Sequence, residues 1–289
     1  MKKTSTYKLY PGIELAFCEY NLQESSCRHK PENEIIEINY CQSGRIGWKT
    51  QDGSTVYLGS GDFAIHTKGV CSGLDITFPN GSYSGLSIYV DLKNCNQNLT
   101  ELLTETPVTG DSIYKKFCTE RDFITFPGSE TTKGIFDGFF GVPVELKYAY
   151  YKLKLQELFL YLYRLDLKSV RETNGFRPDQ IEMIKQIHDR LTENLDRRIT
   201  IEELSRQFPI NPSTMKILFK SVYGNSIAAH IKEHRMEKAT QLLRCGVSIS
   251  EAAKSVGYDS QSKFSSEFKK AYQMLPTEYK SMYKRNGEG

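Results

Sequence analysis

Apolar and polar residues alternate over roughly the first 95 positions, which is the period of a strand with one buried face. In EIIEINYCQSGRIGW, the apolar Ile36, Ile38 and Tyr40 alternate with Glu37 and Asn39. Glycine-containing turns separate this segment from other short apolar runs, among them FAIHT, LDITF and GLSIYV. Several short strands divided by glycine turns predict a small antiparallel barrel or sandwich.

Helical spacing begins near Pro143, a residue suited to the first turn of a helix. Over 143–166 apolar residues recur at intervals of four and three, and they are Val144, Tyr148, Tyr151, Leu155, Leu158, Leu162 and Leu165. Such a seam predicts a helix–helix interface. The helix either packs on its own barrel or forms a dimer contact. The dimer alternative uses Tyr148, Tyr151, Leu155, Leu158 and Leu162.

A polar segment at 169–178, containing Gly175 and Pro178, is the predicted linker. It divides the chain into a strand-rich domain at 1–168 and a helical domain at 179–289. The second domain opens with one amphipathic stripe, formed by Ile181, Ile184, Ile187, Leu191 and Leu195.

The helical domain contains an internal repeat. Thr200 with Glu203 and Ser248 with Glu251 are two capping boxes, each of which begins a short helix. A break follows each helix, and a second helix follows the break. The apolar seams of these second helices correspond, and they are Met215, Phe219 and Tyr223 in the first copy and Phe264, Phe268 and Tyr272 in the second.

A short capped helix, a turn and a second helix form the helix-turn-helix pattern of DNA-binding proteins. Between the two copies, residues 226–243 predict one helix of roughly 27 Å. Such a connector places two second helices about one DNA turn apart, ~34 Å, so that both enter successive major grooves. The charge agrees with this assignment. The chain carries +3 overall, but from Arg171 onward it holds 20 Lys/Arg and 15 Asp/Glu.

From Thr200 to Tyr283 the chain resembles the DNA-binding domain of the AraC/XylS family of transcription regulators. The matching segments are IEELS…NPSTMKILFKSVYG, HIKEHRMEKATQLL and SISEAAKSVGYDSQSKFSSEFKKAYQMLPTEY. A strand-rich half before a helical half is similar to members with an N-terminal cupin-like sensor. The resemblance implies an α+β chain. Its parts are an N-terminal cupin-like antiparallel β-barrel with flanking helices and a C-terminal all-α domain of two helix-turn-helix units joined by a connector helix.

Two positions depart from the family pattern. The first repeat ends at Gly224, whereas the equivalent position of the second is Gln273. The second cap therefore differs, or Gln273 adopts a left-handed conformation. The first recognition helix carries the apolar Ile217 where relatives place a polar residue that contacts bases.

Residues opposite each seam, near the start of the second helices, are the predicted base contacts. They are Ser213, Thr214, Lys216, Ile217, Gln261, Ser262, Ser265 and Ser266. Phosphate contacts are expected from neighbouring lysines, namely Lys220, Lys263, Lys269 and Lys270.

The resemblance implies a regulator of transcription, an activator rather than an enzyme. Its partners would be double-stranded promoter DNA, RNA polymerase, a small-molecule effector and a second copy of the chain. No cofactor and no membrane contact are expected, and the cytoplasm is the expected location because no signal segment is recognisable. Aromatic residues and one histidine of the front half are the candidate effector pocket, and they are Tyr40, Trp48, Tyr57, Phe63, His66, Tyr83 and Tyr89.

Two other functions remain open. One is a metal-dependent cupin enzyme fused to a DNA-binding domain, although the clustered His and carboxylate ligands of such enzymes are not recognisable. The other is a DNA-binding regulator without a ligand. His230 and His234 lie one helical turn apart, but no third metal ligand is near in sequence, so no metal site is predicted. The seven scattered cysteines predict reduced thiols, mostly buried.

Overall fold

A computed structural model describes residues 2–26, 34–50, 53–70, 75–95, 99–120, 123–167 and 175–285. The chain divides into two compact units, Met1–Pro178 and Asp179–Gly289, and each is described by itself. Most of the predicted linker, residues 169–174, lies outside the described residues. No helix in the described part of the chain is long and apolar enough to cross a membrane.

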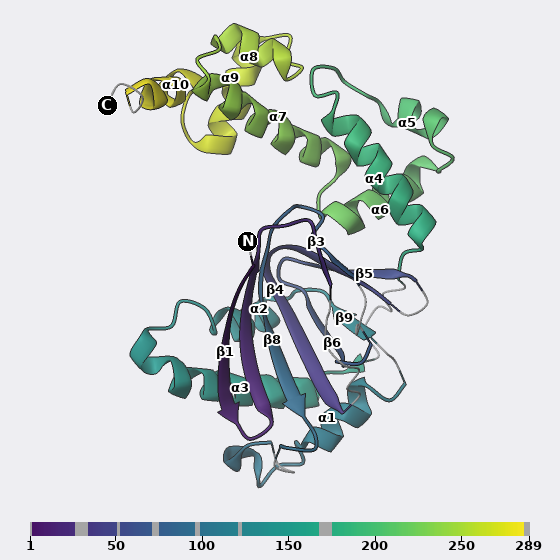
Figure 1. Ribbon diagram of the computed structural model, residues 1–289, viewed down its shortest axis with the longest axis vertical. Helices are drawn as coiled ribbons and strands as arrows, with labels where there is room; N and C mark the ends of the chain where they lie inside the picture. The colour runs from purple at the N-terminus through teal and green to yellow at the C-terminus, as the bar shows by residue number, and fades with distance from the viewer. Residues whose placement is uncertain are drawn as a thin grey trace. The chain divides into compact units, whose positions relative to one another are not determined.

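The N-terminal unit is built on an antiparallel sheet, as predicted (Figure 1). Its strands are β1 (Lys2–Tyr10), β2 (Ile13–Tyr20), β3 (Glu24–Ser26), β4 (Ile35–Lys49), β5 (Thr55–Gly59), β6 (Phe63–Thr67), β7 (Asp75–Thr77), β8 (Tyr83–Asp91) and β9 (Phe123–Phe126). The main order is β1-β2-β8-β4-β6-β9, while β5 and β7 pair with the far half of β4, and β3 pairs with β7. The long strand β4 therefore belongs to both halves of the sheet.

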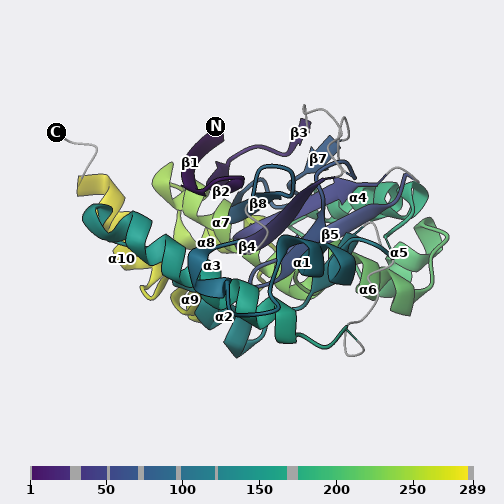
Figure 2. The ribbon, with the colours of Figure 1, turned by 90° about the horizontal axis from the view of Figure 1, so that it is seen from below.

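One face of this sheet is covered by helices (Figure 1 and Figure 2). These are α1 (Gly110–Phe117), α2 (Glu130–Asp137) and α3 (Lys147–Arg164), with short 3-10 turns at Glu101–Leu103 and Val144–Leu146. Alternate strand residues such as Ile36, Ile38 and Tyr40 pack against them in one apolar core. The alternation predicted for this strand is thus confirmed on its helix side.

The opposite face of β4 differs from the prediction of a half-buried strand. Glu37 and Asn39, expected to face solvent, are buried. Asn39 Nδ2 lies 3.0 Å from His66 Nε2, and Ser87 Oγ donates to Asn39 Oδ1 at 2.5 Å. Hydrogen bonds among these polar side chains offset the cost of burying them. Alternation in the sequence shows that successive residues face opposite sides of the sheet, but it does not show whether both sides are covered.

The C-terminal unit is entirely helical over its described residues. Its helices are α4 (Pro178–Thr192), α5 (Ile201–Gln207), α6 (Pro212–Tyr223), α7 (Ile227–Arg244), α8 (Ile249–Ser255), α9 (Gln261–Tyr272) and α10 (Pro276–Arg285). The stripe on α4 is buried through Leu191 as predicted. The last expected member, Leu195, lies beyond the end of α4 in a turn.

Cysteine burial follows the sequence expectation in part. Among the described residues five cysteines are free thiols, of which Cys18 and Cys41 are buried and Cys245 is exposed. Burial, followed by the nearby Asp62 carboxylate, raises the pKa of Cys41 to about 12. The Cys41 thiol therefore stays protonated near neutral pH. Cys27 and Cys71 lie outside the described residues.

Candidate DNA-binding surface

Both predicted capping boxes are present. Thr200 Oγ1 accepts from the Glu203 backbone N–H at 3.2 Å, and Glu203 Oε2 accepts from the Thr200 N–H at 2.8 Å. Ser248 and Glu251 make the same reciprocal pair, both at 3.2 Å. Each pair satisfies backbone donors that a helix start leaves without a partner. The two short helices α5 and α8 therefore begin in the same way.

The second helix of the first repeat, α6, separates a buried and an exposed face. Asn211 caps its start by accepting from the Ser213 N–H at 2.8 Å, and Pro212 takes the first position. One face is buried through Met215, Leu218 and other apolar residues. The five predicted DNA-contact residues on this helix are all exposed, and they are Ser213, Thr214, Lys216, Ile217 and Lys220.

Ile217 is the unusual member of that exposed face. Its side chain is 64% exposed, although the rest of the apolar residues of α6 are buried. An exposed isoleucine surrounded by polar groups contributes nothing to the core. It offers a methyl surface suited to contact with a thymine methyl group.

The second helix of the second repeat, α9, has the same division. Ser260 caps its start, and Phe264 and Phe268 bury one face. Most of the predicted contact residues are exposed, namely Gln261, Ser262, Lys263, Ser266, Lys269 and Lys270, whereas Ser265 is half-buried. The polar first turns therefore lie on the outside of the helix, opposite its aromatic seam.

Lys270, one of the predicted phosphate contacts, already has an acidic partner. Its ammonium donates to Glu267 Oε1 at 2.7 Å, and Glu267 also pairs with Lys232 of α7. Hydrogen bonds from Lys232 and then Lys270 lower the pKa of Glu267 to about 2. A phosphate that binds Lys270 therefore competes with a carboxylate that is ionised at neutral pH.

The two recognition helices end alike despite their different residues. Gly224 and Gln273 both take left-handed conformations, with φ of 88° and 59°, and their N–H groups donate to Lys220 O and Lys269 O. Gln273 therefore adopts the left-handed conformation, which was one of the two alternatives expected from the sequence. Its side chain also donates to Lys270 O at 3.2 Å, which satisfies another terminal carbonyl.

Arg235 connects the second repeat to the segment before the first repeat, a role that the sequence did not indicate. From α7 its Nη2 donates to Arg197 O at 2.9 Å and its Nη1 to Gly257 O at 3.4 Å. Arg197 precedes the first repeat, and Gly257 lies in the turn of the second. Its guanidinium also lies 5.9 Å from the Tyr258 ring centroid. One side chain of the connector therefore contacts the backbone just before the first repeat and the backbone within the second.

The predicted effector residues do not form a single pocket. Tyr40 and Phe63 belong to the helix-side core, whereas Trp48, Tyr83 and Tyr89 pack in a separate core on the other side of the sheet. Tyr57 and His66 are also buried, and His66 stacks on Phe123 with centroids 4.6 Å apart. The expectation of one shared pocket is corrected, because alternate residues of a strand point to opposite faces.

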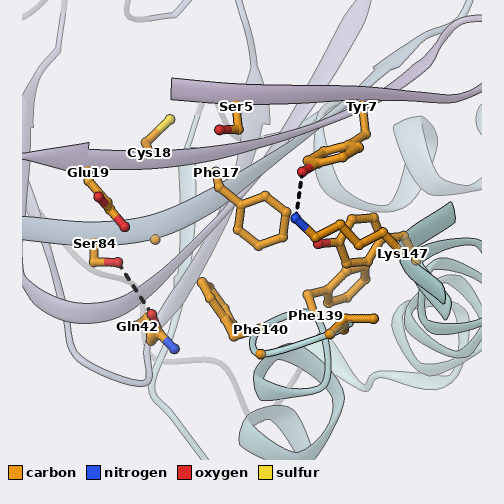
Figure 3. Close-up of a pocket in the computed structure, with 14 residues that line it drawn as sticks. Ser5, Tyr7, Phe17, Cys18, Glu19, Gln42, Ser84, Phe139, Phe140 and Lys147 are labelled. Atoms are coloured by element: carbon orange, nitrogen blue, oxygen red, sulfur yellow. Dashed lines mark hydrogen bonds between the residues drawn. The ribbon is translucent and has the colours of Figure 1, made fainter. Parts of the chain in front are cut away.

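A groove of about 310 Å³ lies elsewhere in the N-terminal unit, between the strands and the 139–142 segment (Figure 3). Aromatic rings line one part of it, including Phe17 and Phe140 with centroids 5.3 Å apart. Lys147 Nζ donates to Tyr7 Oη at 3.1 Å beside these rings. None of the seven predicted effector residues lines this groove.

The predicted dimer seam on α3 is mostly internal. Tyr151, Leu155, Leu158 and Leu162 are buried in the core of their own unit. Packing on the same unit, the first of the two alternatives, is therefore the one observed for these residues, and their assignment to a contact with a second copy is wrong. Of the five, only Tyr148 is exposed, at 56%. A different stripe of apolar residues is exposed on α3 and at the residue just before it, and its members are Leu146, Tyr150, Leu153 and Leu160.

Histidines gather in the C-terminal unit. His188 of α4 joins His230 and His234 of α7, and one ring nitrogen of each lies within 4.8 Å of the others. His230 is buried, and burial followed by the two neighbouring histidines lowers its pKa to about 3. His188 is remote in sequence from the other two histidines, so spacing along the chain did not indicate it, and helix packing alone brings it to them. Over the described residues, no other cluster of this kind occurs.

Comparison with known proteins agrees with this architecture. Residues 204–282 match the model of a helix-turn-helix domain family. The virulence regulon transcriptional activator VirF of Yersinia enterocolitica is 25% identical over 257 residues, covering 81% of this chain and 85% of that protein. The HTH-type transcriptional regulator AlkR of Acinetobacter baylyi is 33% identical over 82 residues, covering 28% of this chain and 27% of that protein.

Among solved structures, unsaturated fatty acid bound ToxT from Vibrio cholerae aligns with 92% of this chain and 94% of its own, at 14% identity and a TM-score of 0.38. Two capped helix-turn-helix repeats on one connector, together with the matched family model, define a helix-turn-helix DNA-binding protein. The relatives are named as regulators of transcription. The chain is a transcription regulator of the AraC family.

Proposed function

We propose that this regulator activates transcription and that both repeats of its C-terminal unit contact promoter DNA. The observation that carries the proposal is the matched design of α6 and α9. Each helix buries an apolar face and exposes a polar face that begins at its first turn. Residues at the start of a recognition helix are the ones that reach base edges in the major groove.

The exposed side chains fall into two groups, one suited to contact bases and one suited to contact phosphates. Gln261 has the amide that pairs bidentately with adenine, and Ser262 and Ser266 accept or donate to several bases. Lys220, Lys263 and Lys269 have ammonium groups that bind phosphate and set the position on the duplex without reading sequence. Base discrimination should therefore depend on Gln261, and general affinity on the lysines.

This division is tested with Gln261→Ala and Lys269→Ala in the full-length protein. An operator is first selected from random-sequence duplexes with the wild-type protein, and binding to it and to a scrambled duplex is measured over a salt series. Gln261→Ala should weaken operator binding by about 10-fold or more, the value of one bidentate pair, and leave scrambled binding unchanged. Lys269→Ala should weaken both and reduce the salt slope by about one.

Gln241→Ala is the matched control, because Gln241 is an exposed glutamine of the same unit on the connector α7. Equal losses on operator and scrambled DNA for Gln261→Ala would contradict the role of Gln261 in reading bases. An unchanged salt slope for Lys269→Ala would contradict its contact with phosphate.

The protein is further proposed to act as a homodimer through the exposed stripe of α3. Leu146, Tyr150, Leu153 and Leu160 recur at helical spacing and expose apolar side chains, with the charged Glu157 between Leu153 and Leu160. Leu153→Glu should convert the dimer to a monomer in sedimentation velocity at micromolar concentration. Leu102→Glu is the control, because Leu102 is exposed but lies in a 3-10 turn apart from α3. A dimer that survives Leu153→Glu would refute this contact.

The effector is proposed to bind in the groove near Lys147 and Tyr7. Its aromatic walls suit an apolar body, and the ammonium of Lys147 suits a polar or anionic group. Native mass spectrometry of the full-length protein should detect a small molecule that the Phe140→Ala variant loses. Retention of the same molecule by Phe140→Ala would exclude this groove.

Activation would also require contact with RNA polymerase.

A further inference from the structure

The three histidines of the C-terminal unit converge through their ring nitrogens. His230 Nε2 and His234 Nε2 are 3.0 Å apart, and a nitrogen of His188 completes a group within 4.8 Å. In a tetrahedral zinc site, with Zn–N of 2.0–2.1 Å, two ligand nitrogens are about 3.3 Å apart. The pair on α7 already has nearly this separation. Small side-chain rotations would bring the third nitrogen to the same distance.

A carboxylate lies near Nδ1 of two of the rings, and the one beside His188 is within hydrogen-bond distance. His188 Nδ1 lies 3.1 Å from Asp189 Oδ1, and His234 Nδ1 lies 3.7 Å from Glu237 Oε2. A carboxylate that accepts from Nδ1–H leaves the Nε2 lone pair facing away from it. Metal-binding histidines have this second partner, which fixes the tautomer and the ring orientation.

Aromatic packing holds the cluster in place. The His188 ring stacks on Tyr223, the last residue of α6, with centroids 4.4 Å apart and planes at 12°. Phe219 packs edge-on against His230, with centroids 5.4 Å apart. The side chains of His188 and His234 are 18% and 34% exposed, so solvent reaches one side of the group. Ions can enter from that side, and a water molecule can supply a fourth ligand.

We propose that His188, His230 and His234 form a binding site for a divalent transition-metal ion of the Zn²⁺ class. Imidazole nitrogen suits Zn²⁺, Cu²⁺, Ni²⁺ and Co²⁺, whereas Mg²⁺ and Ca²⁺ require oxygen ligands. Two histidines at i and i+4 on one helix with a third from another helix is a geometry that these ions use.

The site would join α4 to α7 across the first repeat. A bound ion cross-links two helices that otherwise meet through side-chain packing, and Tyr223 extends the contact to the end of the recognition helix α6. Because the unfolded chain does not present this geometry, binding stabilises the folded unit. Metal would thereby strengthen the first repeat without contacting DNA.

The test uses tag-free, full-length protein stripped of metal with a chelator and titrated with CoCl₂ and then ZnCl₂. Cobalt should bind at one ion per chain, with the visible bands of nitrogen and oxygen ligation and no thiolate charge-transfer band. Free Zn²⁺ at 100 times its dissociation constant should raise the folding constant about 100-fold. That change corresponds to a rise of roughly 10 °C in the helical melting transition.

The variants His188→Ala and His234→Ala should each weaken cobalt binding by at least about 10-fold and reduce the zinc-dependent rise in melting temperature to about half or less at the same free zinc concentration. Both side chains are partly exposed, and melting of the metal-free variants verifies that they fold. Gln186→Ala, an exposed change on α4, should bind metal as the wild type does. The proposal is overturned by the absence of stoichiometric cobalt binding, by a thiolate band, or by unchanged binding in both histidine variants.

Discussion

Replacing Arg235 by methionine should destabilise the C-terminal unit by about 2 kcal/mol. Methionine keeps much of the apolar stem but removes the guanidinium that donates to Arg197 O and Gly257 O. A hydrogen bond from a charged donor contributes about 1.5–3 kcal/mol, and partial solvent exposure places the 2.9 Å bond at the lower end of that range.

Two smaller effects act in opposite directions. The 3.4 Å bond and the contact with the Tyr258 ring together add about 1 kcal/mol. Against this, Arg235 Nε is buried without a hydrogen-bond partner among the described residues, so its removal regains about 0.5–1 kcal/mol. The direct bond to Arg197 O outweighs this gain, and the net effect remains near 2 kcal/mol.

Urea denaturation of the full-length protein, followed by circular dichroism at the helical wavelength, measures this loss. A change of about 2 kcal/mol shifts the midpoint by about 1 M urea. Arg235→Lys should lose roughly half as much, because one ammonium keeps the charge but cannot span both carbonyls. The control is Lys238→Met, an exposed change on the same helix. Equal midpoints for Arg235→Met and Lys238→Met would refute the reasoning.

Three further changes test other parts of the fold. Gly257→Ala should cost more than about 2 kcal/mol in urea denaturation, because φ is +75° and a Cβ would meet a backbone carbonyl oxygen at 2.7 Å. Gly224→Gln should lower the free energy of unfolding by about 1–2 kcal/mol, because a non-glycine residue is strained at this left-handed position. Gln273→Gly should change the free energy of unfolding by less than about 1 kcal/mol, because relief of left-handed strain is offset by the freedom of glycine in the unfolded chain. Tyr40→Phe should cost about 1–2 kcal/mol in the N-terminal unit, because it removes the 2.8 Å hydrogen bond to Asp137; fluorescence of the single tryptophan, which lies in that unit, reports the loss.

Much of the C-terminal unit was predictable because its signals are local. The capping boxes at Thr200 and Ser248, and apolar seams at intervals of three and four, act within one or two helical turns. Repetition of the same signals then distinguished a pair of DNA-binding units from a plain bundle. The exposed positions on α6 and α9 followed from the same seams, since a residue opposite a buried stripe faces outward.

The rest depended on contacts between residues distant in sequence. Arg235 reaches two backbone carbonyls, and His188 meets His230, through helix packing that no spacing rule encodes. On α3 the apolar spacing was read correctly, but two apolar faces were present. The sequence pattern could not show whether the face with Leu155 or the face with Leu153 would be buried. The aromatic residues of the strands failed as a pocket for a related reason, because aromatic content does not distinguish a core from a cavity.

The continuous helix α7 has a consequence for the operators that this regulator can use. Eighteen residues without a break give a connector of about 27 Å that neither lengthens nor pivots as a flexible linker would. A few base pairs inserted between the two halves of an operator would turn the second half away from α9 around the duplex. Insertion of a whole helical turn, about 10.5 base pairs, would restore the orientation but move the target out of reach. The connector would therefore fix the distance between the two half-sites that one protein molecule can bind, and the spacing within an operator would be as restricted as its sequence.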